Sequence, residues 1–263
     1  MRELPMYIVD AFTSQLFGGN PAAVCPLPEW LPDAVMQSIA AENNLSETAF
    51  FVPQARPRRL RWFTPRAEVD FCGHATLASA HVFFEHLQRE ATDVTFDTGV
   101  GTLRLTKGAG GITMRAPLLE PVPCPKPPEI IRQHVPASGG EVFECRDNYF
   151  LVLAAEHDVR EFHADLAQLE KLPFGLCITA RGTDADFVSR YFVPSFGIPE
   201  DPATGSTHAT LAPLWAKRLG RRELRARQLS RRGAQMQCRV EDDAVLITGG
   251  TVTYLQGTIR LPS

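Results

Sequence analysis

The sequence predicts a mixed α/β protein built from two similar halves. At 263 residues the chain is long enough for two domains, each with its own core. Each half contains strands, then a glycine turn that opens a small-sided helix, then more strands. The turns are Cys72-Gly73-His74 and Thr204-Gly205-Ser206, and the pentapeptide HATLA follows at 74–78 and 208–212. Aligning the two glycines offsets the pentapeptides by two residues, so the turn-to-helix pattern is the stronger sign of duplication.

In the first half, periodicity predicts the following elements. They are strands at 6–10, 46–52 and 60–63, helices at 31–44 and 74–87, and strands near 94–98, 102–107 and 111–115. Pro32 favours a helix start there, and the strand at 46–52 is apolar on both faces apart from Glu47 and Thr48. The second helix begins with small residues, which is typical of a helix enclosed by a sheet.

Closely spaced prolines between 117 and 128 mark a linker. We therefore predict domains at 1–116 and 117–250, and allow the strand near 251–263 to pack with the first. The second half is predicted to contain strands at 141–145 and 149–154, a helix at 158–169, strands at 175–180 and 187–193, a helix to about 219, and strands at 234–240, 244–248 and 251–259.

Composition narrows the classes of protein. Hydrophobic residues make up 44% and charged residues 22%, as in ordinary globular chains. No apolar run reaches the roughly 18 to 20 residues that cross a bilayer, and the N-terminus lacks a signal pattern, so we expect a cytoplasmic protein without a membrane partner. The six cysteines are too scattered for a zinc or redox motif, and no metal is predicted.

The net charge of the chain is −3, but two stretches are locally basic, one at 217–232 and one at 56–61. A solvated helix end and loop explain the first stretch better than a nucleic-acid surface, because no aromatic platform or nucleic-acid motif accompanies the charge. A phosphate-bearing partner is the minority alternative.

The glycine turns are candidate anion sites. A turn that feeds a helix leaves the first backbone N–H groups unpaired at the positive end of the helix dipole. Two such ends can hold a substrate carboxylate or a developing enolate. Two ordinary helix starts are the alternative interpretation.

Glu47 is the candidate proton carrier. A lone carboxylate among apolar residues is predicted to have a raised pKa, which suits a group that takes and returns a proton near neutral pH. A buried structural acid bonded to a helix end explains the same pattern nearly as well.

Neighbouring side chains add candidates with simpler alternatives. His74 can donate a proton or bond a substrate oxygen, or merely follow a helix start. Cys72 at a helix N-terminus can form a thiolate, but its counterpart is Thr204, which excludes a two-thiol racemase and favours a structural thiol. Asp201 and Ser206 can act on substrate or serve as helix caps, and the adjacent Glu200 is interpreted as a solvated charge.

Five blocks together carry a family resemblance. They are VDAFTSQLFGGNPAAV, NLSETAFFV, LRWFTPRAEVDFCGHATLASA, SRYFVPSFGIPEDPATGSTHATLAPLWAKRL and QLSRRGAQM, from residue 9 to 236. In this order they resemble the phenazine-biosynthesis PhzF family. The resemblance implies a diaminopimelate-epimerase-like fold of two pseudo-symmetric halves, each a curled sheet or barrel around a central helix, with the active site between them. It also implies a homodimer and an isomerase that needs no cofactor.

The resemblance also implies roles for individual residues. Glu47, in the NLSET block, would be the acid/base group, and His74, Asp201 and Ser206 would support it. The predicted substrate-binding residues are Gly73, Gly205, Asn20, Cys72 and Thr204. We therefore expect an isomerase that moves a proton on a small, cyclic, carboxylate-bearing substrate. An epimerase or racemase acting at one carbon, and a silent binding homologue, are the alternatives.

Overall fold

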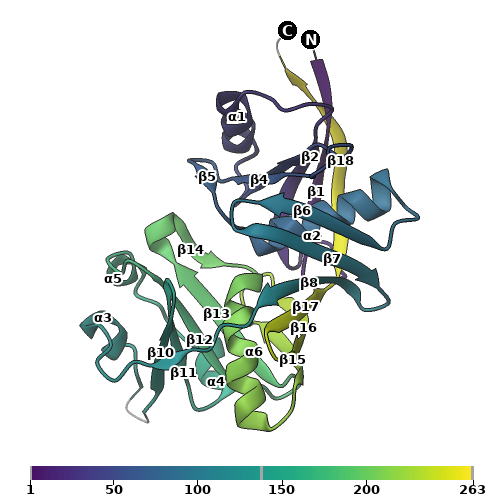
Figure 1. The fold of residues 1–263 in the computed structure, drawn as a ribbon. Helices are drawn as coiled ribbons and strands as arrows, with labels where there is room; N and C mark the ends of the chain where they lie inside the picture. The colour runs from purple at the N-terminus through teal and green to yellow at the C-terminus, as the bar shows by residue number, and fades with distance from the viewer. Residues whose placement is uncertain (1, 137–138, 262–263) are drawn as a thin grey trace. The chain divides into compact units, whose positions relative to one another are not determined.

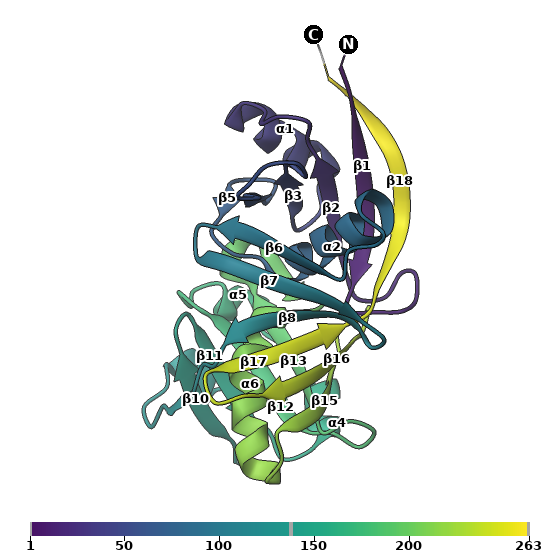
Figure 2. The ribbon, with the colours of Figure 1, turned by 45° about the vertical axis from the view of Figure 1, so that its right-hand side comes forward.

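The computed structural model describes residues 2–136 and 139–261. Within them the chain divides into two compact units, residues 1–115 with 248–263 and residues 116–247. The last strand, β18 (Thr251–Leu261), lies in the first unit because it pairs antiparallel with β1 (Arg2–Ala11). Figures 1 and 2 show these two strands side by side.

The first unit contains a six-stranded sheet in the order β18-β1-β2-β3-β4-β5. The new strands are β2 (Asn20–Pro26), β3 (Thr48–Phe51), β4 (Leu60–Phe63) and β5 (Glu68–Val69). Strands β2 and β3 run parallel and are joined through helix α1 (Asp33–Asn43), whereas the other neighbours are antiparallel. Three further strands, β6 (Asp93–Thr98), β7 (Gly101–Gly108) and β8 (Gly111–Pro117), form an antiparallel meander outside the six-stranded sheet.

Both faces of β3 are buried, as its apolar sequence predicts. Phe50 packs in one cluster with Met36 of α1, whereas the ring of Phe51 lies 5.4 Å from that of Phe96 on β6. Helix α2 (Gly73–Val82) contacts β1, β2 and β3, and all ten of its residues are buried. A π-helical turn, Phe83–Leu87, continues α2.

The second unit repeats this arrangement around a second sheet (Figure 1). Its strands follow the order β17-β16-β15-β13-β12-β11-β10-β9, and β14 pairs with β13. The strands are β9 (Val122–Pro123), β10 (Glu141–Cys145), β11 (Asn148–Val152), β12 (Gly175–Arg181), β13 (Phe187–Val193), β14 (Ile198–Asp201), β15 (Glu223–Gln228), β16 (Ala234–Val240) and β17 (Ala244–Gly249). The helices are α3 (Glu129–Arg132), α4 (Glu156–Arg160), α5 (Leu166–Leu169), the 3-10 turn Pro194–Phe196 and α6 (Gly205–Leu219).

The two units share one topology. In each, an antiparallel pair (β1-β2, β10-β11) leads through a helical crossover to a strand parallel to the second (β3, β12). An antiparallel strand follows (β4, β13), then a glycine turn, a long helix (α2, α6) and three final strands. The mixed α/β fold and the duplicated pattern predicted from sequence are therefore confirmed.

One predicted helix is wrong. The segment predicted as a single helix at 158–169 forms two short helices, α4 and α5. The break arises because the side chain of Asp165 caps α5, accepting a hydrogen bond of 3.1 Å from the backbone N–H of Gln168. A residue that bonds its own backbone in this way competes with helix continuation.

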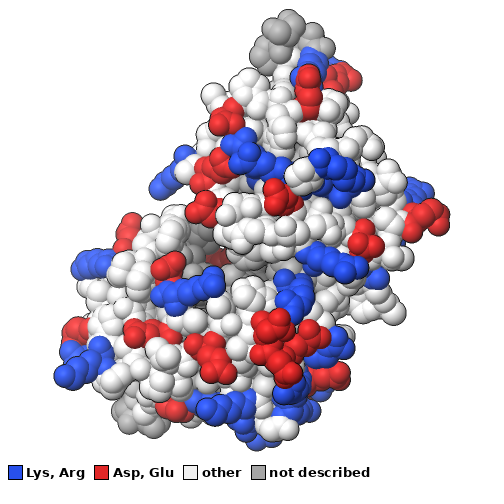
Figure 3. Space-filling model, viewed as in Figure 1, with Lys and Arg blue, Asp and Glu red and all other residues white. Residues whose placement is uncertain are grey.

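The basic stretch at 217–232 is not a loop throughout. Helix α6 ends at Leu219 and is followed by Gly220 in the left-handed conformation. Residues Glu223–Gln228 then form β15. Several of its arginines are paired with acids, as Arg218 is with Glu141 and Arg222 with Asp242, both at 2.8 Å. Figure 3 shows acidic and basic residues interspersed on the face drawn. Strand β2 was not predicted from the sequence. It follows a turn, and its alanines and prolines are not typical of strands.

Among the helices of residues 2–136 and 139–261, none combines the length and apolar character needed to cross a membrane.

We expect Leu151→Ala to destabilise the protein by about 2–5 kcal/mol, because it removes buried methyl groups and leaves a cavity. Leu151 is fully buried in the core of the second unit. Urea unfolding followed by circular dichroism measures the loss. Leu166→Ala is the control, since Leu166 is 38% exposed and should cost less than about 1 kcal/mol. Equal losses would contradict this account of the core.

Candidate active site

The first glycine turn brings Cys72 and His74 to the start of a buried helix. Cys72 adopts an extended conformation immediately before α2. Its carbonyl accepts hydrogen bonds from both the backbone N–H (3.1 Å) and the hydroxyl (2.6 Å) of Thr76. No side chain caps this helix, so the N–H groups of Gly73 and its neighbours remain directed at whatever binds there.

Glu47 forms a buried ion pair with His74. Its Oε2 lies 3.1 Å from Nε2 of His74, and the two side chains are only 12% and 6% exposed. The contact has an ion-pair distance but not the alignment of a hydrogen bond. Glu47 immediately precedes β3 rather than lying within it, and its carbonyl accepts from the backbone N–H of Ala23 in β2. The strand pairing therefore fixes the backbone position from which the Glu47 side chain extends.

The predicted rise in the pKa of Glu47 is wrong in direction. Burial alone would raise it, but the positive charge of His74 in close contact outweighs burial and lowers the pKa of Glu47. In the same way, burial would lower the pKa of His74, yet Cys72 and Glu47 raise it well above its usual value. The apolar neighbours of Glu47 were visible in the sequence, whereas the imidazolium 27 positions away was not.

Cys72 is a thiol at neutral pH. Burial, and then the charge of Glu47, raise its pKa to about 11, opposite to the effect expected of a helix N-terminus. Its Sγ lies 3.4 Å from Nδ1 of His74. Atoms of Glu47, Cys72 and His74 lie within 4.8 Å of one another and could ligate a metal ion. Binding would require the thiol and the imidazole to lose their protons, because ligands must be deprotonated.

Asn20 and Ser46 complete the surroundings of the imidazole. The amide nitrogen of Asn20, at the start of β2, lies 3.1 Å from Nδ1 of His74. The hydroxyl of Ser46 lies 3.4 Å from Nε2. Rotation of the Asn20 amide lets it accept from the cation or donate to the neutral ring. Asn20 was predicted from the sequence and Ser46 was not, although Ser46 directly precedes Glu47.

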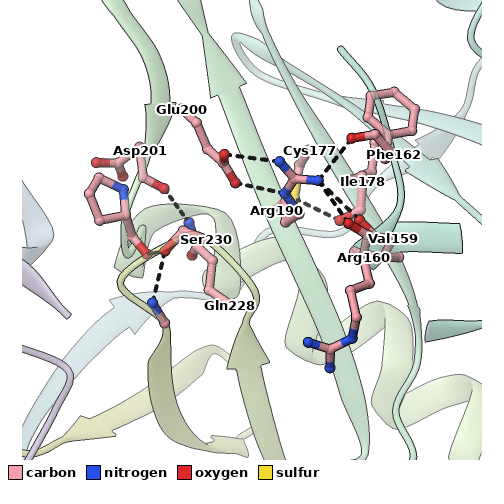
Figure 4. A network of polar contacts seen from close by, with 12 residues as sticks. Val159, Arg160, Phe162, Cys177, Ile178, Arg190, Glu200, Asp201, Gln228 and Ser230 are labelled. Carbon is pink, nitrogen blue, oxygen red and sulfur yellow. Dashed lines mark hydrogen bonds and ion pairs between the residues drawn. The ribbon is translucent and has the colours of Figure 1, made fainter. Parts of the chain in front are cut away.

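The second glycine turn is held by a different network, all within the second unit. Thr204 donates its hydroxyl hydrogen to a carboxylate oxygen of Asp201. Its backbone N–H donates to the side-chain oxygen of Gln228 (2.9 Å), whose amide nitrogen in turn donates to the carbonyl of Asp201 (2.7 Å). Ser230 bonds the carbonyl of Pro202 at 2.8 Å (Figure 4). The network fixes the backbone that leads into Gly205.

Gln228 was missed by sequence analysis, although it opens the QLSRRG block. It is fully buried, and three of its contacts converge on the turn. Ser206, by contrast, is exposed at the start of α6. Glu200 is not the solvated charge that was expected, because Arg190 holds it in a two-point ion pair at 2.7 and 3.0 Å (Figure 4).

The predicted site residues therefore form two groups. Glu47, Cys72, His74 and Asn20 lie together in the first unit. Asp201, Thr204, Gly205 and Ser206 adjoin one another in the second unit. The first group contains a buried ion pair, and the second contains a hydroxyl and amide network anchored on one buried carboxylate.

Comparisons with known proteins agree with the resemblance. A family model described as phenazine biosynthesis-like protein (PhzC-PhzF) matches residues 9–257. An uncharacterized isomerase of Pseudomonas aeruginosa is 44% identical, over 98% of this chain and all of that protein. The crystal structure of a PhzF-family protein from Enterococcus faecalis is 41% identical, with a TM-score of 0.94 over 99% of this chain and all of that one. A predicted epimerase of P. aeruginosa shares the fold, with a TM-score of 0.72 over 98% of this chain and all of that one, at 20% identity.

We expect Glu47→Gln to lower the pKa of His74, because the carboxylate favours the imidazolium and burial disfavours it. Titration of the histidine ring signals by NMR measures the change. In the wild type the pair loses its contribution to stability as pH falls through the lowered pKa of Glu47. The pair also loses this contribution to stability as pH rises through the raised pKa of His74.

Glu85→Gln is the matched control for this titration. Glu85 raises the pKa of His81 and is not among the groups that act on His74. The control should therefore leave the pKa of His74 unchanged while it lowers that of His81. An unchanged pKa of His74 in the Glu47 variant would show that the ion pair does not set its protonation.

Proposed function

Because this chain belongs to the phenazine biosynthesis-like (PhzC-PhzF) family, we propose that it is an isomerase that moves a proton on a small, cyclic, carboxylate-bearing substrate. A relative that covers nearly the whole chain is named an isomerase, which supports the class of reaction. The single observation that carries the proposal is the buried Glu47–His74 pair at the uncapped start of α2. No cofactor is assigned, in keeping with the family resemblance.

In this proposal Glu47 is the proton carrier. Its lowered pKa keeps it ionised at neutral pH, so it can remove a proton from a carbon made acidic by an adjacent carboxylate or carbonyl. The protonated carboxyl group then returns the proton to another carbon of the same substrate. A carboxylate with a lowered pKa is a weak base, so the intermediate anion needs strong stabilisation.

His74 and the helix start supply that stabilisation in the proposal. The raised pKa of His74 keeps a positive charge beside Glu47, and when the carboxylate takes up the proton, the negative charge formed on the substrate replaces that of Glu47 as the partner of the imidazolium. The backbone N–H groups in the first turn of α2 add the positive end of a helix dipole. Fixed donors of this kind act most strongly where water is excluded.

The second turn is assigned to the same reaction on the basis of the family resemblance. We propose that Asp201 and Ser206 support proton transfer, and that Gly205 contributes a backbone donor. The contacts of Thr204 and Gln228 keep the carboxylate of Asp201 and the backbone of this turn in place. Asp201→Asn keeps the shape of the side chain while it removes the charge, and should lower turnover if the assignment is correct.

We expect Glu47→Gln to reduce proton transfer by about 10²–10⁴-fold, the usual contribution of a general acid/base group. Small cyclic and aromatic carboxylic acids that raise the melting temperature of the wild-type protein are incubated with it in deuterated water. Mass spectrometry then measures deuterium incorporation into each acid. The variant should keep its fold and lose the incorporation, because glutamine can neither take nor return a proton.

Glu42→Gln is the matched control, since Glu42 is exposed on α1 and should leave incorporation unchanged. Chiral analysis of the product separates the alternatives: inversion at the exchanging carbon with no shift of a double bond would indicate an epimerase or racemase. Acids that bind without any exchange in the wild type would indicate a binding protein and reject the isomerase. An unchanged rate in the Glu47 variant would reject Glu47 as the proton carrier.

A further inference from the structure

A pocket of the first unit contains a buried arginine that has no acid partner among residues 2–136 and 139–261. The pocket has a volume of about 700 Å³ and lies among residues 53–58, the end of the π-helical turn, and strands β6 and β7. None of its lining residues belongs to the Glu47, Cys72, His74 and Asn20 group. Arg58 lines it and is only 7% exposed.

Arg58 uses part of its bonding capacity on the protein. Its Nε donates to the carbonyl of Pro53 (3.0 Å) and its Nη1 to the carbonyl of Thr95 (3.3 Å). Its guanidinium also lies 4.5 Å from the ring centre of Phe83, a favourable cation–π distance. A guanidinium has five N–H donors, so three remain after these two bonds.

Two partly buried arginines of this chain are neutralised by carboxylates, whereas the buried Arg58 is not. Arg61 bonds the carboxylates of Glu68 and Asp33, and Arg190 bonds Glu200. Within the described residues, 2–136 and 139–261, no carboxylate forms an ion pair with Arg58. Burial, and then the charge of Arg56, lower the pKa of Arg58. A bound anion would offset both unfavourable effects, since buried charges are normally paired.

The rest of the lining defines what kind of anion fits. Arg56 lines the pocket, so a second guanidinium is present. Asp93 and Asp97 line it as well, and Asp93 lies 3.9 Å from Arg104. Two carboxylates would repel a polyanion such as a nucleic acid. They would accept hydrogen bonds from hydroxyl or ammonium groups of a small molecule.

We propose that this pocket binds a small polar molecule through one oxyanion group, a carboxylate or a phosphate, which pairs with Arg58 and Arg56. Hydroxyl or ammonium donors of the same molecule bond Asp93 and Asp97. The site is independent of the proton-transfer chemistry. It gives the basic stretch at 56–61 a ligand-binding role.

Titration of the protein with inorganic phosphate, and separately with acetate, tests the proposal. Backbone amide shifts are followed by NMR, with chloride used to match ionic strength. We expect shifts to centre on residues 93–97 of β6, because the backbone there bonds Arg58 directly: the N–H of Asp97 donates to the carbonyl of Arg58 at 2.8 Å. The probe that binds more tightly shows whether the oxyanion is a phosphate or a carboxylate.

Two substitutions and one control decide the outcome. Arg58→Gln and Arg56→Gln should each raise the dissociation constant at least about tenfold, the effect of losing a charge-assisted hydrogen bond. Arg59→Gln removes the same charge from an exposed residue outside the lining and should leave binding unchanged. If Arg58→Gln does not fold, the Arg56 variant decides. The proposal fails if neither probe shifts residues 93–97, if shifts centre on Gly73 and His74, or if the Arg56 and Arg59 variants bind alike.

Discussion

The buried contact between Glu47 and His74 is the constraint on which the proposed chemistry of the first unit depends. Two side chains that each prefer water are held 3.1 Å apart with little exposure. Neither could stay charged there alone, because burial raises the pKa of the acid and lowers that of the imidazole. Each reverses the effect of burial on the other. A buried pair of this kind adds little net stability, so its presence points to a role in chemistry.

The duplicated topology explains how distant segments reach this pair. Parallel pairing of β2 with β3 sets Asn20 and Glu47 at the starts of neighbouring strands. Helix α2 packs against the same strands and begins at the turn that carries His74. The packing that forms the core is therefore the packing that assembles the site, and its residues need not be close in sequence.

Patterns within a few residues predicted the fold class, the central helices and the main strands correctly. Most of the predictions that failed depended on contacts between distant segments or on side-chain hydrogen bonds. The strand β2 has few of the branched residues typical of strands, and the helix at 158–169 is broken by the capping of Asp165. The pKa of Glu47 was misjudged because its apolar neighbours are adjacent in the chain, whereas the decisive histidine arrives through folding. Arg58 showed no signal beyond the basic stretch to which it belongs.

The repeated pentapeptide shows how identical sequences take different roles after duplication. His74 lies one residue after Gly73 and faces a carboxylate, whereas His208 lies three residues after Gly205. His208 is fully buried, its Nδ1 lies 2.8 Å from the carbonyl of Thr204, and burial lowers its pKa to about 4. It is therefore a neutral ring that holds the second turn. The topology was duplicated and the charged pair was not, which is why the proposed proton carrier lies in the first unit.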